Sequence, residues 1–208
     1  MDKLLLDRAE GPVVVTALAS EQGGEYQQAT DHGVRHLRAL GCGAVGAPDI
    51  REHPAQALAL LRTARLLVLP GGSPSRLLTS LLSTPVGELL TELVADGGAV
   101  LGASAGAMVL GAWTVLPDRK GPASLAVVPG LAVVPGVLVV PHWSDGSSRA
   151  DWLRAVQEGV PPDVTVLGLP EESGVLVEDG VLTAVGQHPT TLVSHERDLP
   201  LGQTWRVA

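Results

Sequence analysis

The sequence of 208 residues contains no phenylalanine and a single cysteine, and only 2% of its residues are aromatic. Single-stranded nucleic acids are bound largely by stacking on aromatic side chains, so this scarcity argues against such partners. One cysteine, Cys42, excludes an internal disulfide and a four-cysteine metal site. We interpret Cys42 as a small buried residue and expect a reducing, cytoplasmic location.

Positive charge is also scarce, since 14 Lys and Arg against 22 Asp and Glu give a formal net charge of -8. Phosphate backbones are bound by clustered Lys and Arg, so nucleic acid is not an expected partner. No apolar run reaches the roughly 18 residues that a spanning helix needs. The start, Met1–Glu10, lacks the basic and apolar regions of a secretory signal. We therefore expect neither a membrane partner nor secretion.

Hydrophobic residues nevertheless make up 45% of the chain, in short bursts separated by many of its 25 Gly and 16 Pro. This composition and length fit one domain, residues 1–208. Apolar bursts predict buried strands, and amphipathic stretches predict helices. The predicted strands are 12–19, 44–45, 66–69, 99–103, 137–140 and 164–167. The predicted helices are 25–40, 54–65, 74–82, 85–96, 107–113 and 149–159.

Strands that alternate with helices predict an α/β fold, a three-layer α/β/α sandwich around a mainly parallel sheet. Turn signals at Asp179-Gly180 and Gly186 predict a small antiparallel C-terminal extension. The AVVPG sequence at 126–130 recurs at 132–136, and two short copies are interpreted as local repetition.

The strongest local motif is Gly102-Ala103-Ser104-Ala105-Gly106, a G-x-S-x-G sequence between a predicted strand and a predicted helix. Glycines on both sides let the strand and helix approach closely and expose the serine hydroxyl. Ser104 is therefore the candidate nucleophile, and the Ala105 N–H at the helix start is a candidate oxyanion donor. A close-packed turn without catalysis is the alternative interpretation.

A nucleophilic serine needs a base, and His142 follows the predicted strand 137–140 at the same sheet edge as Ser104. Glu171 follows the next predicted strand, where its carboxylate can orient the imidazole. The alternative acids are Glu172, Asp145 and Asp118. The other five histidines lie on a predicted helix, in a loop or in the tail, where surface roles are the ordinary expectation.

The Gly71-Gly72 turn follows another strand, and the Gly72 N–H is the second candidate oxyanion donor. Ser73 is placed to cap the helix that follows. The stretch lacks the spacing and lysine of a phosphate-binding loop, and the sequence contains no H-E-x-x-H metal motif. We expect no cofactor and no metal.

Taken together, these segments resemble the cyanophycinase and dipeptidase E family of serine peptidases, which has a class I glutamine amidotransferase-like fold. The segment LGASAGAMVLG resembles that family's nucleophile segment, and LPGGSPSRLL its Gly-Gly turn. GLAVVPGVLVVPHWSD resembles its histidine strand, and VLGLPEESGVLVEDG its later glutamate segment.

The resemblance implies nucleophile Ser104, base His142, and oxyanion donors Gly72 and Ala105. The acid is Glu171 by the cyanophycinase pattern and Asp118 by the dipeptidase E pattern, and we favour Glu171. The resemblance also implies that the substrates are short peptides or aspartyl peptides, and that the protein forms a homodimer. A class I amidotransferase has a cysteine as the nucleophile of the strand-to-helix turn, whereas this chain has Ser104 there. Glutamine hydrolysis is therefore disfavoured.

Two other functions use the same sequence differently. An α/β-hydrolase esterase would use Ser104 with a later histidine, His188. A non-catalytic binding domain would have the same fold, but Ser104 would not act as a nucleophile. For a substrate carboxylate, the candidate partners are Arg76, Arg149 and Arg154, although a solvated surface role is the ordinary expectation for each.

Overall fold

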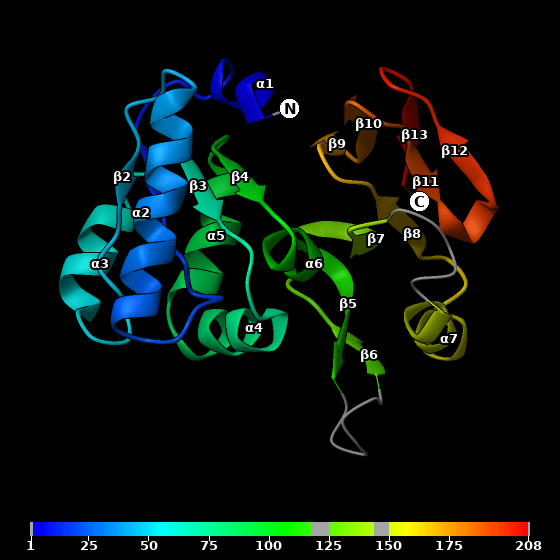
Figure 1. Ribbon diagram of the computed structural model, residues 1–208, viewed down its shortest axis with the longest axis horizontal. Coiled ribbons are helices and arrows are strands. Elements are labelled where there is room, and N and C mark those ends of the chain that lie inside the picture. The colour runs from blue at the N-terminus through cyan, green and yellow to red at the C-terminus, as the bar shows by residue number, and fades with distance from the viewer. Residues whose placement is uncertain (1, 118–124, 144–149, 208) are drawn as a thin grey trace. The chain divides into compact units, whose positions relative to one another are not determined.

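The computed structural model describes residues 2–117, 125–143 and 150–207 (Figure 1). The chain divides after Ala107 into two compact units, here called the N-terminal unit, Asp2–Ala107, and the C-terminal unit, which starts at Met108. The sequence predicts a single peptidase domain over residues 1–208, and this stays a prediction, since two compact units can belong to one domain.

A four-stranded parallel sheet forms the centre of the N-terminal unit, in the order β2-β1-β3-β4. Its strands are β1 (Val13–Val15), β2 (Val45–Gly46), β3 (Leu66–Leu69) and β4 (Ala99–Gly102). All residues of β1 and β3 are buried, as expected for strands covered on both faces. Because the strands are parallel, their carboxyl ends lie along one edge.

Six helices accompany this sheet, and five of them were predicted with ends that differ by no more than four residues. They are α1 (Asp2–Leu6), α2 (Gly24–Ala39), α3 (Pro54–Leu61), α4 (Pro74–Ser83), α5 (Val86–Ala95) and α6 (Ala105–Leu110), whose last three residues belong to the C-terminal unit. Val34 and Leu37 of α2 pack with Val15 and Val68 on one face of the sheet. In Figure 1, α2 lies in front of the strands and α5 behind them. The predicted three-layer α/β/α arrangement is thus present here.

The C-terminal unit contains a six-stranded mixed sheet in the order β12-β11-β8-β7-β5-β6. Its strands are β5 (Gly111–Pro117), β6 (Leu125–Pro129), β7 (Val134–Pro141), β8 (Thr165–Leu169), β11 (Thr190–Leu192) and β12 (Arg197–Leu199). The middle strands β5, β7 and β8 are parallel. Helix α7 (Ala150–Gly159) and a short 3-10 helix, η2 (Val193–His195), complete the packing around the buried Leu138 and Val140.

The tail also forms a separate antiparallel sheet, which confirms the predicted C-terminal extension. It consists of β9 (Ser173–Glu178), β10 (Val181–Gly186) and β13 (Thr204–Arg206) in the order β13-β10-β9. Asp179 and Gly180 both have positive φ, 49° and 72°, and join β9 to β10. Positive φ at both turn residues is typical of a two-residue β-hairpin turn, as the Asp-Gly pair predicted.

One predicted helix is too long, and one strand was not predicted, between residues 107 and 129. The predicted helix 107–113 ends at Leu110, and residues 111–117 form β5 instead. A Cβ on Gly111 would lie 2.6 Å from the Val137 carbonyl oxygen, so this position is pressed against β7. Residues 125–129, which include most of the first AVVPG copy, form β6, a strand that was not predicted and that pairs with β5. Strand pairing therefore overrides the helical pattern.

The architecture is mixed α/β, with parallel central strands and antiparallel strands added toward the C-terminus. Within the described ranges, no single helix has the length and apolar character to cross a membrane. The pair α4 and α5 passes that test jointly, but the two helices are bent by 83° relative to each other.

Candidate active site

The turn that carries Ser104 connects β4 to α6 in the N-terminal unit. Ser104 has φ 50°, a left-handed conformation that is uncommon for a residue with a side chain. The Gly106 N–H donates to the Ala103 carbonyl at 2.8 Å, and the Ala103 N–H donates to Leu69 at 3.0 Å. The predicted strand, serine turn and helix are present, and the turn is fastened to the end of β3.

The turn has no room for a side chain at Gly102 or Gly106. A Cβ on Gly102 would lie 2.6 Å from the Gly106 carbonyl carbon, and one on Gly106 would lie 2.2 Å from the Leu69 oxygen. Both distances are shorter than real Cβ contacts, so any larger residue would push the strand and helix apart. The G-x-S-x-G pattern is therefore a packing requirement of this turn, whatever the serine does.

This packing makes a stability prediction. Gly106→Ala should lower the free energy of unfolding by about 1–3 kcal/mol or more, because the added methyl group overlaps rigid backbone. Urea denaturation measures the loss. Gly24→Ala is the matched control, since Gly24 begins α2 with open space around it and should be neutral or slightly stabilising. Equal midpoints for the two variants would contradict the packing argument.

The Gly71-Gly72 turn lies beside the serine turn in the same unit. A Cβ on Gly71 would lie 3.2 Å from Ser104 Cβ and 3.7 Å from Ser104 Oγ. Gly72 has φ 143°, and a Cβ there would overlap Ala19. Ser73 then caps α4 by accepting from the Arg76 N–H at 3.3 Å, which confirms the predicted cap. The structure thus brings the glycine turn to the candidate nucleophile.

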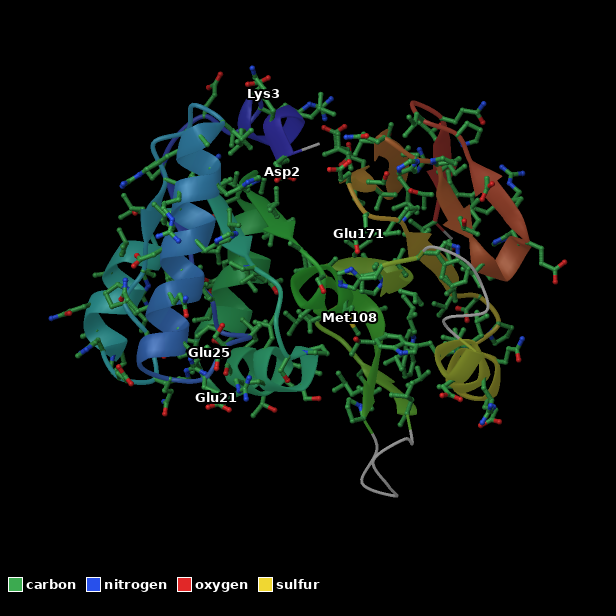
Figure 2. All side chains as sticks on the ribbon, viewed as in Figure 1. Asp2, Lys3, Glu21, Glu25, Met108 and Glu171 are labelled. Carbon is green, nitrogen blue, oxygen red and sulfur yellow. The ribbon has the colours of Figure 1, made fainter. Side chains whose placement is uncertain are left out.

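His142 and Glu171 meet in the C-terminal unit. Pro141 and Leu169 are register partners at the ends of the parallel strands β7 and β8, and the Trp143 N–H donates to the Leu169 carbonyl at 2.9 Å. His142 Nδ1 lies 2.5 Å from Glu171 Oε1 in a hydrogen bond. Figure 2 shows Glu171 where β8 ends. The predicted neighbours His142 and Glu171 are joined by the strand register. The prediction that His142 shares a sheet with Ser104 is wrong, because β4 and β7 belong to different sheets.

Both members of this pair are accessible, with side chains 48% exposed for His142 and 75% for Glu171. His142 has φ 56°, so it too lies in a left-handed turn directly after its strand. Trp143 packs on Gly168, where a Cβ would lie 2.5 Å from the indole ring. The sequence analysis did not single out Gly168, although a glycine inside a buried strand is itself a sign of close approach.

Of the other candidate acids, Glu172 lies within the described residues. Glu172 also has positive φ, 54°, and its carbonyl accepts from the Gln187 N–H at 3.0 Å. Asp118 and Asp145 lie outside the described residues, as does Arg149. Of the remaining candidate carboxylate partners, Arg76 pairs with Glu21 at 3.0 Å and Arg154 with Asp151 at 3.2 Å.

The remaining histidines occupy other places. His36 pairs with Asp2 at 2.8 Å, His53 precedes α3, and the His195 ring packs edge-on against Trp205. The His188 backbone N–H donates to Ser173 Oγ at 2.8 Å. Among the described residues, no cluster of three or more His, Cys, Asp or Glu side chains forms a metal site.

Cys42 packs against the hydrophobic core cluster that includes Val34 and Leu37 of α2, and it is partly buried. Burial raises the pKa of the Cys42 thiol above its ordinary value, which keeps it protonated and a poor nucleophile at neutral pH. This environment agrees with the interpretation of Cys42 as a small packing residue.

The chain is similar in fold to solved structures of peptidases. The chain is similar over 99% of its length to a crystal structure of a peptidase from an acI-B1 Actinobacterium, with 21% identity, 89% of that chain covered and a TM-score of 0.79. It is also similar to a candidate peptidase E protein from Listeria monocytogenes EGD-e, with 19% identity and a TM-score of 0.64. That match covers 89% of this chain and 93% of the other. At these identities the likeness shows the fold.

No curated protein shows significant sequence similarity to the chain. The model of peptidase family S51 matches residues 13–185, a range that contains both the serine turn and the His142–Glu171 pair. The chain therefore belongs to peptidase family S51, the dipeptidase E and cyanophycinase family, and is a serine peptidase.

Proposed function

We propose that the protein hydrolyses short peptides, in the manner of dipeptidase E, through an acyl-enzyme on Ser104. His142 acts as the base and Glu171 orients it, while the N–H groups of Gly72 and Ala105 stabilise the oxyanion. The observation that carries this proposal is the 2.5 Å hydrogen bond between His142 Nδ1 and Glu171 Oε1. A carboxylate on Nδ1 fixes the tautomer in which Nε2 accepts the serine proton.

In this mechanism Ser104 Oγ attacks the scissile carbonyl carbon as its proton passes to His142 Nε2. The new C–O bond forms as the carbonyl electrons move to oxygen, where the two N–H groups receive the negative charge. Collapse breaks the C–N bond, and His142 gives its proton to the leaving amine. Water then attacks the acyl-enzyme by the same route and regenerates Ser104. Throughout, the ionised Glu171 stabilises the charged imidazolium.

The dipeptidase type of substrate is supported by the family and by the name of the Listeria neighbour, peptidase E. The family also includes enzymes of aspartyl peptides, so peptides that begin with aspartate are the first to test. A panel of Asp-X dipeptides, β-aspartyl-arginine and neutral dipeptides should contain at least one that the wild type cleaves. Release of both amino acids, followed by mass spectrometry, measures cleavage. Failure to cleave any member would contradict the proposal.

The acid assignment is tested separately. Glu171→Gln keeps the size of the side chain but removes the charge that stabilises the imidazolium, and kcat should fall by about 10⁴-fold. Steady-state kinetics on the best dipeptide measure the loss. Asp118→Asn is the matched comparison and should leave kcat within about threefold of the wild type. The reverse pattern, with Asp118→Asn inactive and Glu171→Gln normal, would assign the acid to Asp118.

A further inference from the structure

Asp49 is the one charged side chain that is buried among the described residues, at 4% exposed, and the mechanism above does not use it. It lies in the N-terminal unit, after β2, and forms a two-pronged ion pair with Arg51. Arg51 Nη2 lies 2.7 Å from Asp49 Oδ2, and Nε lies 2.8 Å from Oδ1. The Arg51 backbone N–H also donates to Oδ1 at 3.0 Å. This carboxylate is thus fully engaged.

The third guanidinium nitrogen of Arg51 reaches a different segment. Arg51 Nη1 donates to the Ser20 carbonyl at 3.0 Å. Ser20 closes a buried turn, because its N–H donates to the Ala17 carbonyl at 2.9 Å. We call residues 16–21, which follow β1, the β1 loop. The Asp49–Arg51 pair therefore holds one end of the β1 loop at a fixed place.

Other bonds fix the remaining parts of the β1 loop. At its start, Thr16 Oγ1 lies 3.0 Å from the Tyr26 hydroxyl, which donates to the Ala47 carbonyl at 3.0 Å. Burial raises the pKa of Tyr26, so the hydroxyl stays neutral and able to donate. At its end, the Glu21 N–H donates to Glu25 Oε1 at 3.1 Å, and both carboxylates appear at the foot of α2 in Figure 2.

The β1 loop in turn supports the glycine turn. The Ala19 carbonyl accepts from the Ser73 N–H at 3.0 Å and from Arg76 Nη1 at 3.1 Å. A Cβ on Gly72 would lie 2.8 Å from Ala19 Cβ and 2.9 Å from the Ala19 oxygen. Gly72 is therefore in direct contact with the β1 loop. A shift of Ala19 by a few tenths of an ångström would move Gly72 as well.

We propose that Arg51 and Asp49 are positioning residues for catalysis, which act through the β1 loop to aim the Gly72 N–H at the oxyanion beside Ser104. This inference rests on the proposed function. A buried ion pair contributes little net stability compared with apolar residues of the same size, so its value here lies in geometry. Oxyanion donors stabilise the transition state only at the right distance and direction, and small misplacements are costly.

The test compares three variants with the wild type on the best dipeptide. Asp49→Asn/Arg51→Met removes both charges together, so no uncompensated charge remains buried, and the Asn oxygen can still accept from the residue 51 N–H. Arg51→Lys keeps the charge but loses the fork that reaches Ser20. Arg38→Met is the matched control, because Arg38 Nε also donates to a backbone carbonyl, that of Ala44, at 3.2 Å.

The double variant should lower kcat by about 10- to 100-fold with KM within about twofold, since the Gly72 donor acts mainly in the transition state. Arg51→Lys should give an intermediate kcat, and Arg38→Met a normal one. The amide signal of Gly72 in a ¹⁵N-labelled sample should shift in the double variant and not in Arg38→Met. If the ion pair had a purely structural role, the double variant would contain less folded, active protein. The folded part would keep a normal kcat and an unshifted Gly72 amide signal.

The outcomes separate the two proposals. A wild type that cleaves no peptide overturns the proposed function, and this inference with it. An active wild type and a folded double variant of equal kcat overturn this inference alone. If the double variant does not fold, Arg51→Lys decides in the same way, because a kcat equal to the wild type contradicts the positioning role.

Discussion

Ser104→Ala is expected to lower kcat for dipeptide hydrolysis by about 10⁶-fold, to a rate near the detection limit. The variant keeps the two proposed oxyanion N–H groups but has no oxygen to form the acyl-enzyme, and in the proposed mechanism serine, base and acid act as one unit. The measurement is steady-state hydrolysis of the best dipeptide, with a fluorophosphonate probe as a second readout. The probe should label the wild type at Ser104 and leave the variant unlabelled.

The control for this variant is its stability. Residue 104 has φ 50°, and alanine tolerates that conformation about as poorly as serine does, so the urea midpoint should change little. A folded Ser104→Ala protein that retains wild-type activity would show that another residue is the nucleophile. A wild type that resists the fluorophosphonate while cleaving peptides would contradict an activated serine.

His142→Ala is expected to have an effect of similar size, about 10⁶-fold on kcat, because the serine then loses the group that accepts its proton. His188→Ala is the matched comparison and should stay within about threefold of the wild type. The contact recorded at residue 188 is made by its backbone N–H, which the substitution leaves in place. Parallel kinetics of the two variants measure the difference.

These two histidines also distinguish the rival enzymes. An esterase of the α/β-hydrolase type places its histidine last in the chain, so it would lose activity in His188→Ala and keep it in His142→Ala. Such a result would require a different base and a different acid. Unchanged activity in both variants would exclude His142 and His188 as the base.

The central strands and the serine turn could be predicted because their signals are local. Val13–Val15 and Leu66–Leu69 are short, apolar and bounded by turn residues, which is the pattern of a strand buried on both faces. Gly102 and Gly106 mark the turn because no other residue fits there. The pairing of His142 with Glu171 followed from one further rule, that parallel strands end at the same edge.

The segments that the sequence did not reveal depend on distant partners. Residues 111–113 continue a helical pattern, yet Gly111 and Trp113 pair with β7 and belong to β5. The strand β6 is recognisable only beside β5. The sequence predicts one strand over 12–19, whereas β1 ends at Val15 and residues 16–19 belong to the β1 loop. Its bond to Arg51 joins residues 31 positions apart, which no local pattern encodes.

The backbone conformation of the serine turn is set by residues other than Ser104. Gly102, Gly106 and the Leu69 carbonyl close the backbone around position 104, and none of these contacts involves the serine side chain. The backbone is thus specified by its neighbours, while the reactive atom is specified by one residue. A thiol in place of the hydroxyl would inherit the same presentation without a new fold. In this architecture the kind of nucleophile and the scaffold that displays it can evolve independently.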